Sequence, residues 1–343
     1  MQNNTTASSH RMLASSRPFS IRRFFFQWEW MLVLLLIAVN VFNTNSSPNY
    51  LVWGNLMSNL QGLFDKALLV FPMMLVILLG EIDISVASTM SLSAVVMGVA
   101  FQAGIPLPIA IGFALVVGLA CGAINGIILA KFPELSSMIV TLSTQIIYRG
   151  VANMILEDRA VSKFPAWFQY LGWGYVGPIP FIMIVFAVLA VVFGVVIHCT
   201  RFGRNVYAMG NNETTARYSG IQTGKYKIII YTIMGLFAAV AGVFLASKLS
   251  SVRPSIGKGY ELDVIAMVVL GGVSNSGGKG RVIGVVISVF IVSLLRYGLG
   301  IVNVPSQTIL VIIGCMLIVA VAIPNLKESV GSLPIFRKLR RNR

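Results

Sequence analysis

Long apolar runs separated by short polar connections dominate the chain. A helix needs roughly 20 apolar residues to cross the hydrocarbon core, because lipid offers no partner for free backbone N–H and C=O groups. Several runs are shorter than this, but none carries the polar face of a soluble helix. The pattern predicts an all-α integral membrane protein with about ten transmembrane helices. The runs lie at 30–43, 66–80, 86–101, 106–130, 137–156, 179–199, 228–247, 263–275, 282–299 and 305–323.

Composition agrees with this interpretation. Hydrophobic residues make up 57% of the 343 residues and charged residues only 11%, which is far too apolar for a soluble domain. We therefore expect one transmembrane domain over 30–325. It is flanked by an amino-terminal tail, 1–29, and a basic carboxyl-terminal tail, 326–343.

Basic residues indicate the orientation. Cytoplasmic loops retain Lys and Arg near the ends of spans, and the ten-span arrangement collects most of the 26 basic residues on one side. Both termini are therefore predicted to be cytoplasmic. The net charge of +15 does not require a nucleic-acid partner, because loop anchors and the terminal cluster at 337–341 suit anionic lipid headgroups.

Two polar breaks interrupt the apolar pattern. Gly80-Glu81-Ile82-Asp83 lies on the predicted inner side, and Gly259-Tyr260-Glu261-Leu262-Asp263 lies on the outer side. Each has a glycine followed by an acid-hydrophobe-acid triplet, as expected if the chain divides into inverted-repeat halves of five helices, a common transporter plan. The candidate residues of a translocation pathway are Glu81, Asp83, Ser85, Asn125, Thr141, Glu261 and Asp263.

The carboxylates in these breaks have two interpretations. Ionisable groups at membrane depth are costly and often functional, so they could form a proton relay. Alternatively, Asp83 and Asp263 each precede a helix and could cap its free N–H groups. We favour capping.

Glycines occur in two further patterns. Gly118, Gly122 and Gly126 share one helix face and predict close helix packing. The glycine-rich segment 271–280 fails the phosphate-loop pattern, since Val273 stands where its first glycine is needed and Gly280 follows Lys279. With only two histidines, no catalytic or metal cluster can be proposed. No cofactor is expected.

The polar stretch 200–227 carries five basic residues between two long apolar runs. Because nothing else in the chain could bind ATP, we interpret it as a docking surface for a motor on another subunit. Within it, Asn212 is a candidate helix cap and Gly220 a candidate terminator of a short helix. A solvated basic loop held inside by charge alone is the plainer alternative.

Four motifs in order carry a family resemblance. They are Gly80–Ser88 (GEIDISVAS), Val140–Leu142 with Tyr148–Gly150, Thr200–Ile221 and Gly259–Gly284. From about 56 to 324 the chain resembles the permease subunits of bacterial ABC importers for ribose, xylose, rhamnose and autoinducer-2, which are related to those for branched-chain amino acids. It departs from that pattern at Glu81 and Ala87, where the family commonly has glycine.

The resemblance implies a role and partners. It implies a permease in the bacterial inner membrane for a small sugar-like solute. The expected partners are a second permease, identical or paralogous, two cytoplasmic ATPase subunits and an external binding protein. The segment 200–227 looks like the part that contacts the ATPase. Its candidate contact residues are Arg204, Asn212, Glu213, Ala216, Arg217, Ser219 and Gly220.

Other classes of protein are alternatives. A self-sufficient, proton-coupled secondary transporter would use Glu81, Asp83, Glu261 and Asp263 for coupling protons. A receptor or scaffold is a weaker alternative, because a passive scaffold has no need of broken helices.

Overall fold

The computed structural model describes residues 28–157, 159–316 and 318. Most of this part of the chain is helical and almost none of it is sheet, which confirms the all-α membrane class. The predicted tails, 1–29 and 326–343, lie outside the described residues except for Trp28 and Glu29, which begin the first described helix.

Six described helices are long and apolar enough to cross a membrane. They are α2 (Trp28–Ser46), α7 (Leu107–Lys131), α8 (Ser137–Leu156), α10 (Phe181–Cys199), α13 (Thr223–Leu249) and α15 (Val282–Ile301). A seventh span is possible if the pair Trp53–Gln61 and Phe64–Leu78, bent by 54°, crosses as one unit. The count of about ten spans therefore stays a prediction.

The remaining predicted runs fall on shorter helices, except that residues 317 and 319–323 of the last run lie outside the described residues. The bent pair consists of α3 (Trp53–Gln61), α4 (Phe64–Ala67) and α5 (Val70–Leu78); the others are α6 (Val86–Gln102), α14 (Tyr260–Leu270) and a helix at Ser306–Met316. Every residue of α5 is buried, and it packs against α10, α11, α13, α14 and α15. A helix enclosed by protein need not match the thickness of the lipid, so the length criterion does not apply to it.

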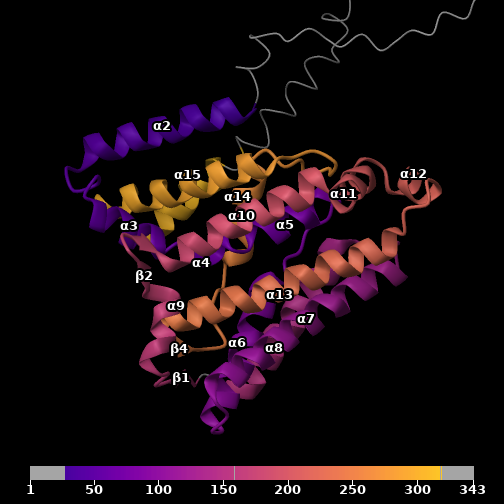
Figure 1. Ribbon diagram of the computed structural model, residues 1–343, viewed down its shortest axis with the longest axis horizontal. Coiled ribbons are helices and arrows are strands. Elements are labelled where there is room, and N and C mark those ends of the chain that lie inside the picture. The colour runs from indigo at the N-terminus through magenta and orange to yellow at the C-terminus, as the bar shows by residue number, and fades with distance from the viewer. Residues whose placement is uncertain (1–27, 158, 317, 319–343) are drawn as a thin grey trace, which may run out of the picture.

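The glycine face of α7 packs against α13, as predicted. A Cβ atom added at Gly122 would lie 2.2 Å from the carbonyl oxygen of Tyr231, and one at Gly118 would lie 2.4 Å from that of Gly235. Small residues allow this approach, which gives close backbone packing without side-chain interdigitation. In Figure 1, α7 and α13 run side by side along the lower half of the molecule.

One end of the molecule carries a small cap. The hairpin of β2 (Tyr175–Val176) and β3 (Ile179–Pro180) lies here with the helices η1 (Ala166–Phe168) and α9 (Gln169–Trp173). The strand β1 (Val161–Ser162) pairs antiparallel with β4 (Ser251–Val252). Because β1 follows α8 and β4 follows α13, this pairing ties the ends of those helices together.

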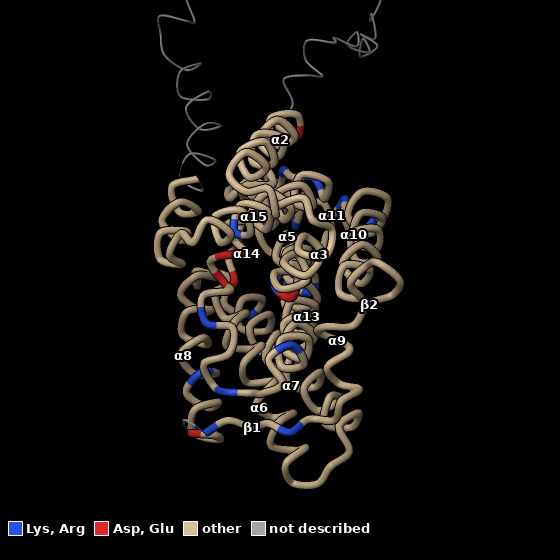
Figure 2. The backbone as a smooth tube through the Cα atoms, turned by 90° about the vertical axis from the view of Figure 1, so that its left-hand side faces the viewer, with Lys and Arg blue, Asp and Glu red and all other residues tan. Residues whose placement is uncertain are grey.

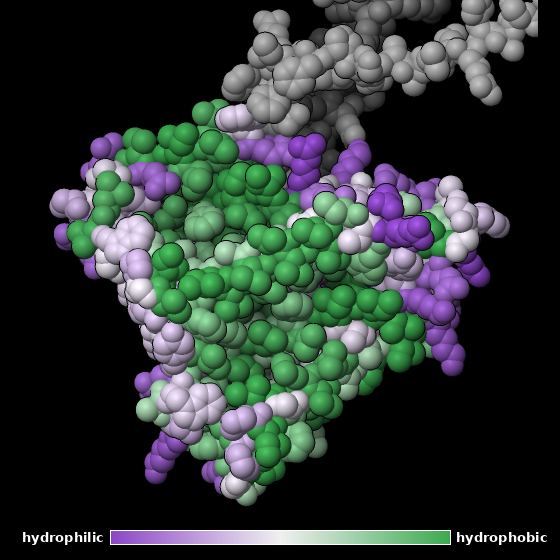
Figure 3. All heavy atoms as spheres, viewed as in Figure 1, coloured by the Kyte–Doolittle hydropathy of each residue, from purple (hydrophilic) through white to green (hydrophobic). Residues whose placement is uncertain are grey.

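The opposite end carries α11 (Arg201–Asn211) and α12 (Glu213–Tyr218), as Figure 1 shows. In the space-filling view of Figure 3, hydrophilic residues collect at these two ends, and a broad apolar surface lies between them. Exposed apolar side chains on α7, α8 and α10 include Val116, Ile146 and Val191. The distribution is that expected of a protein surrounded by lipid along its middle.

Candidate functional site

The first predicted break joins α5 to α6 and is held by side chains from α8. Gly80 has a φ of +79°, a conformation that glycine adopts without strain. The Ile82 N–H donates to the Ser137 hydroxyl over 3.3 Å, and the Ile84 N–H donates to the Thr141 hydroxyl over 3.2 Å. Buried backbone groups need such partners, so α8 fixes the shape of the break.

Asp83 begins a polar chain that runs from the break into α7 and α8. Its Oδ1 accepts hydrogen bonds from the backbone N–H of Ser85 (2.8 Å) and from the Ser85 hydroxyl (2.6 Å). The Asn125 side-chain amide donates to Ser85 Oγ over 2.8 Å, and the Tyr148 hydroxyl donates to Asn125 Oδ1 over 3.3 Å. Asp83 thus bonds the N–H of Ser85, the residue before α6, but α6 itself has no side-chain cap, so the prediction that Asp83 caps this helix is wrong.

In the second break, the two acids have different positions and contacts from those predicted. Gly259, with a φ of +89°, stands immediately before α14, and the Glu261 carboxylate accepts a hydrogen bond of 3.1 Å from the Gly259 N–H. Asp263 lies inside the first turn of α14 instead of preceding it. The prediction that Asp263 caps a helix is wrong, and the contact with a free N–H is made by Glu261.

Asp263 is instead an acceptor for a buried lysine and a partly buried arginine. Lys66 Nζ lies 2.6 Å from one of its oxygens, and an Arg296 nitrogen lies 2.5 Å from the other. A buried carboxylate needs such partners, because desolvation strongly disfavours an isolated charge. In the projection of Figure 2, the acidic positions of α14 lie between α8 and α15.

A neighbouring acid extends this network. The Tyr260 hydroxyl donates to Asp65 over 2.7 Å, and Lys248 Nζ lies 3.2 Å from the same carboxylate. Lys66 also lies over the Tyr260 ring, 4.9 Å from its centroid. Sequence reasoning missed Asp65, Lys66, Lys248 and Arg296, and the only signal was a charge within or beside an apolar run.

Arg149 connects α8 with the segment before α14. Its guanidinium donates to the carbonyl oxygens of Pro254, of Ile256 (3.1 Å) and of Ala87 (3.2 Å). Gln145, one turn earlier, donates to Glu261 over 3.4 Å. These contacts bring Glu261 to α8, whereas Asp83 and Asp263 belong to separate hydrogen-bonded groups. The structure therefore does not gather all seven pathway candidates around one centre.

The polar stretch 200–227 forms a compact helical unit, α11 followed by α12. Thr200 Oγ1 accepts from the Gly203 N–H over 3.3 Å, and Asn212 Oδ1 accepts from the Thr215 N–H over 2.8 Å. Gly220 ends the unit with a φ of +86°. The predicted cap at Asn212 and the predicted terminator at Gly220 are therefore confirmed, and the segment is not an irregular loop.

One of the residues predicted to contact the ATPase is buried. Ala216 is only 4% exposed and is covered by its own chain, so it offers no surface to a partner. The other candidate contacts, Arg204, Asn212, Glu213, Arg217, Ser219 and Gly220, are exposed. Tyr218 is 90% exposed. Sequence reasoning did not single it out, although an aromatic residue in a polar helix was a usable signal.

The α11 helix packs tightly against the glycine-rich segment 271–281. A Cβ atom at Gly210 would lie 1.8 Å from the carbonyl oxygen of Leu78 and 2.5 Å from the Gly278 nitrogen. The Tyr207 hydroxyl donates to the carbonyl oxygen of Gly280 over 2.6 Å. Burial raises the pKa of Tyr207, which keeps this donor protonated. The glycines serve backbone packing here.

An ion-pair bridge links α12 to the first break. Lys227, near the start of α13, places its Nζ 2.8 Å from Glu81 and 3.0 Å from Glu213. The Lys227 side chain is 8% exposed, that of Glu81 13% and that of Glu213 45%. Residues predicted separately as pathway and coupling candidates are thus joined by one lysine.

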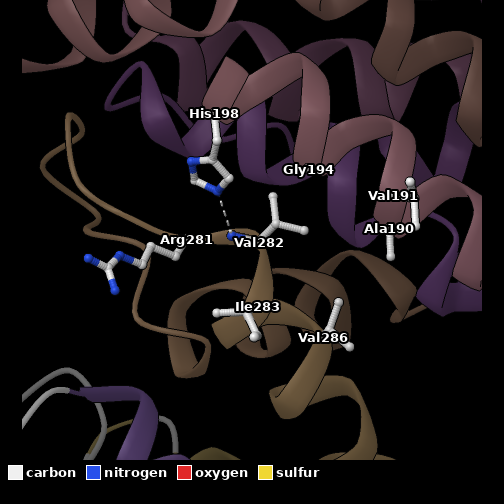
Figure 4. Close-up of a pocket in the computed structure, with 8 residues that line it drawn as sticks. All are labelled: Ala190, Val191, Gly194, His198, Arg281, Val282, Ile283 and Val286. Atoms are coloured by element: carbon white, nitrogen blue, oxygen red, sulfur yellow. Dashed lines mark hydrogen bonds between the residues drawn. The ribbon is translucent and has the colours of Figure 1, made fainter. Parts of the chain in front are cut away.

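A cavity of about 520 Å³ lies elsewhere, between α10 and α15. Figure 4 shows its largely apolar lining, with His198 accepting a 3.3 Å hydrogen bond from the Val282 N–H at one end. None of the predicted pathway or coupling residues lines this cavity. We therefore base the functional site on the two breaks and the α11–α12 unit.

Comparisons with known proteins agree with these features. Residues 63–321 match the family profile described as "Branched-chain amino acid transport system / permease component". The chain is 34% identical to the ribose import permease protein of Escherichia coli (strain K12) over 323 residues, covering 92% of this chain and 100% of the relative.

Two further relatives give a similar result. The ribose import permease protein of Bacillus subtilis (strain 168) is 36% identical over 300 residues, covering 87% of this chain and 92% of the relative. The autoinducer 2 import system permease protein of Escherichia coli O9:H4 (strain HS) is 34% identical over 304 residues, covering 86% and 91%. No solved structure matches the chain.

These matches cover most of the chain and include both breaks and the α11–α12 unit. Together with the apolar helices, they make the chain a multi-pass protein of the bacterial inner membrane. The chain belongs to the branched-chain amino acid transport system permease family, and within it to the ABC importer permeases that its sequence motifs resemble.

Proposed function

We propose that this protein is the permease subunit of an ATP-driven importer for a small sugar or sugar-like solute, such as ribose, rhamnose or autoinducer-2. The names of its relatives, ribose and autoinducer 2 import permeases, support a sugar-like solute over an amino acid. ATP is hydrolysed on a separate cytoplasmic subunit, and an external binding protein delivers the solute. Two permeases, identical or paralogous, form the pathway.

The observation that carries this proposal is the α11–α12 unit. It is an exposed helix pair on a rigid base: Asn212 caps α12, Ala216 anchors it and Gly210 packs α11 onto Leu78. A rigid helix can transmit a displacement to the membrane domain, which an irregular loop cannot. Both termini and this unit face the cytoplasm in the proposed orientation.

We define the coupling surface by the exposed residues of this unit, Arg204, Asn212, Glu213, Arg217, Tyr218, Ser219 and Gly220. Tyr218 is its anchor, because exposed aromatic residues in rigid settings commonly dominate the energy of protein interfaces. ATP binding then favours one of two openings through a difference in affinity for the two conformations.

The pathway is proposed to run beside the two breaks. Residues of the first break and its supports are Glu81, Asp83, Ser85, Asn125 and Thr141; Glu261 and Asp263 belong to the second. Broken helices place polar groups at membrane depth where a solute can reach them. The related positions of the breaks in the two halves support an inverted repeat, which remains part of this proposal.

Transport in proteoliposomes tests the function. The permease is reconstituted with its cognate ATPase and binding protein, and uptake of labelled D-ribose, L-rhamnose and autoinducer-2 is measured with ATP enclosed. We expect uptake of one of these solutes to require ATP and to stop when the phosphate-loop lysine of the ATPase is replaced. Uptake driven by a proton gradient without ATP would support the secondary-transporter alternative instead.

A second measurement tests the coupling surface. Tyr218→Ala should weaken co-purification of the ATPase about tenfold or more, since interface anchors often contribute 2 kcal/mol or more. Tyr175→Ala is the matched control, because Tyr175 is also exposed, at 41%, but lies at the opposite end in the β2–β3 hairpin. Equal recovery of the ATPase with both variants would reject the surface.

A further inference from the structure

The coupling surface reaches the first break by two separate contacts. One is the packing of Gly210 in α11 against Leu78, whose carbonyl oxygen also accepts a 2.9 Å hydrogen bond from the Gly278 N–H. The other is the bridge from Glu213 in α12 through Lys227 to Glu81. Leu78 ends α5 and Glu81 lies in the break, so the two contacts bracket Leu79 and Gly80.

The two contacts differ physically. The Gly210 contact is backbone against backbone with no spare volume, so it behaves as a fixed pivot. The Lys227 contact is an ion pair shared between two carboxylates, and its strength depends on which of them remains close. Only the second contact can change without repacking the backbone.

The two acids are not equivalent. The Glu81 side chain is 13% exposed, whereas that of Glu213 is 45% exposed. If α12 moves, the Glu213 carboxylate can be solvated by water. If Glu81 moved away from Lys227, a nearly buried ammonium would lose its buried partner, which is costly. When Glu213 moves away, Lys227 is paired with Glu81 alone. The ion pair then no longer ties Glu81, and with it the break, to α12.

We propose that Lys227 is a positioning residue that transmits displacement of α12 to the break at Gly80–Ser85. This inference rests on the proposed docking of an ATPase at the coupling surface. Glu81 is also a position where the chain departs from the glycine of the family it resembles, so this arm of the bridge is a feature of this chain. Lys227 acts through Glu81 and needs no contact with the solute.

The test measures movement of the break without requiring a known solute. Ile82, partly exposed within the break, is replaced by Cys in a Cys199→Ser and Cys315→Ser background, since those two cysteines are exposed and Cys121 is buried. The rate of maleimide labelling is measured for the permease–ATPase complex, with and without ATP and vanadate. We expect the nucleotide to change this rate about fivefold, a typical size of coupling between sites.

Lys227→Met should abolish this nucleotide-dependent change while the ATPase still co-purifies and hydrolyses ATP. Lys227→Arg should restore much of the change, because it keeps the charge. Lys225→Met is the matched control: Lys225 is exposed on the same helix and should leave the response intact. A purely packing role for Lys227 would lower membrane levels and ATPase recovery together.

Clear outcomes would overturn the inference. The inference is contradicted if the labelling rate still responds to nucleotide in Lys227→Met, or if it does not respond in the protein with the original lysine. In either case, normal ATPase binding and uptake would still support the proposed function. If Lys227→Met does not reach the membrane, Glu213→Gln breaks the exposed arm instead, and an unchanged response there also contradicts the inference. Failure of the original complex to retain the ATPase overturns the proposed function and this inference with it.

Discussion

Lys66 and Asp263 form an ion pair in the interior, with the lysine Nζ 2.6 Å from a carboxylate oxygen. Their side chains are only 5% and 11% exposed, and the contact joins α4 to α14. Arg296 of α15 contacts the other oxygen of the same carboxylate. One acid is therefore shared by two cations from different helices.

Replacing Asp263 should destabilise the protein strongly. Asp263→Asn leaves Lys66 and Arg296 without their shared acid, and breaking a buried pair commonly costs about 3–5 kcal/mol. Lys66→Met should cost less, because Arg296 still pairs with Asp263. The midpoint of thermal unfolding in detergent, followed by fluorescence-detected size exclusion, measures both effects.

The exposed pair of Glu157 and Arg159 provides the control. Its atoms are 3.0 Å apart, but the side chains are 70% and 79% exposed, and such pairs contribute about 0–1 kcal/mol. Arg159→Ala should leave the unfolding midpoint nearly unchanged. Equal midpoints for Asp263→Asn and Arg159→Ala would contradict the role assigned to the buried network.

The contact of α7 with α13 predicts an intolerance of larger side chains. At Gly122 an added Cβ would meet the Tyr231 carbonyl oxygen at 2.2 Å, so Gly122→Leu should prevent accumulation of folded protein in the membrane. Even Gly122→Ala should lose about 1–3 kcal/mol by overpacking. Gly112→Leu, on the same helix with no atom within 4 Å of an added Cβ, should accumulate normally.

Asp83 allows a hydrogen-bonding role to be separated from a proton relay. Asp83→Asn keeps an oxygen that can accept from the Ser85 N–H, whereas Asp83→Ala removes it and should cost about 1 kcal/mol as a lost buried hydrogen bond. We expect uptake to survive largely in Asp83→Asn and to fall in Asp83→Ala. Loss of uptake in both variants, with normal membrane levels, would favour a titrating carboxylate.

Features governed by local sequence could be predicted well. The Asn212 cap, the Gly220 terminator and the glycine face of α7 follow from short-range patterns, and the structure confirms them. The described parts of the apolar runs likewise fall largely on helices. In these cases the residues that determine the structure are close neighbours in the chain.

Features governed by distant contacts could not be predicted. Lys66 and Asp263 are 197 positions apart, and no periodicity connects them. Ala216 belongs to a polar helix, so only the fold shows that it faces inward. The bridge through Lys227 could not be predicted for the same reason. Glu81 and Glu213 are far apart in the sequence, and only the packing of the helices brings both of them to Lys227.

The complete burial of α5 has a consequence for the environment of the protein. With all of Val70–Leu78 buried within the protein, this helix is shielded from the acyl chains. Changes in bilayer thickness, which act on spans that meet lipid, can reach the adjoining Gly80–Ser85 break only through neighbouring helices.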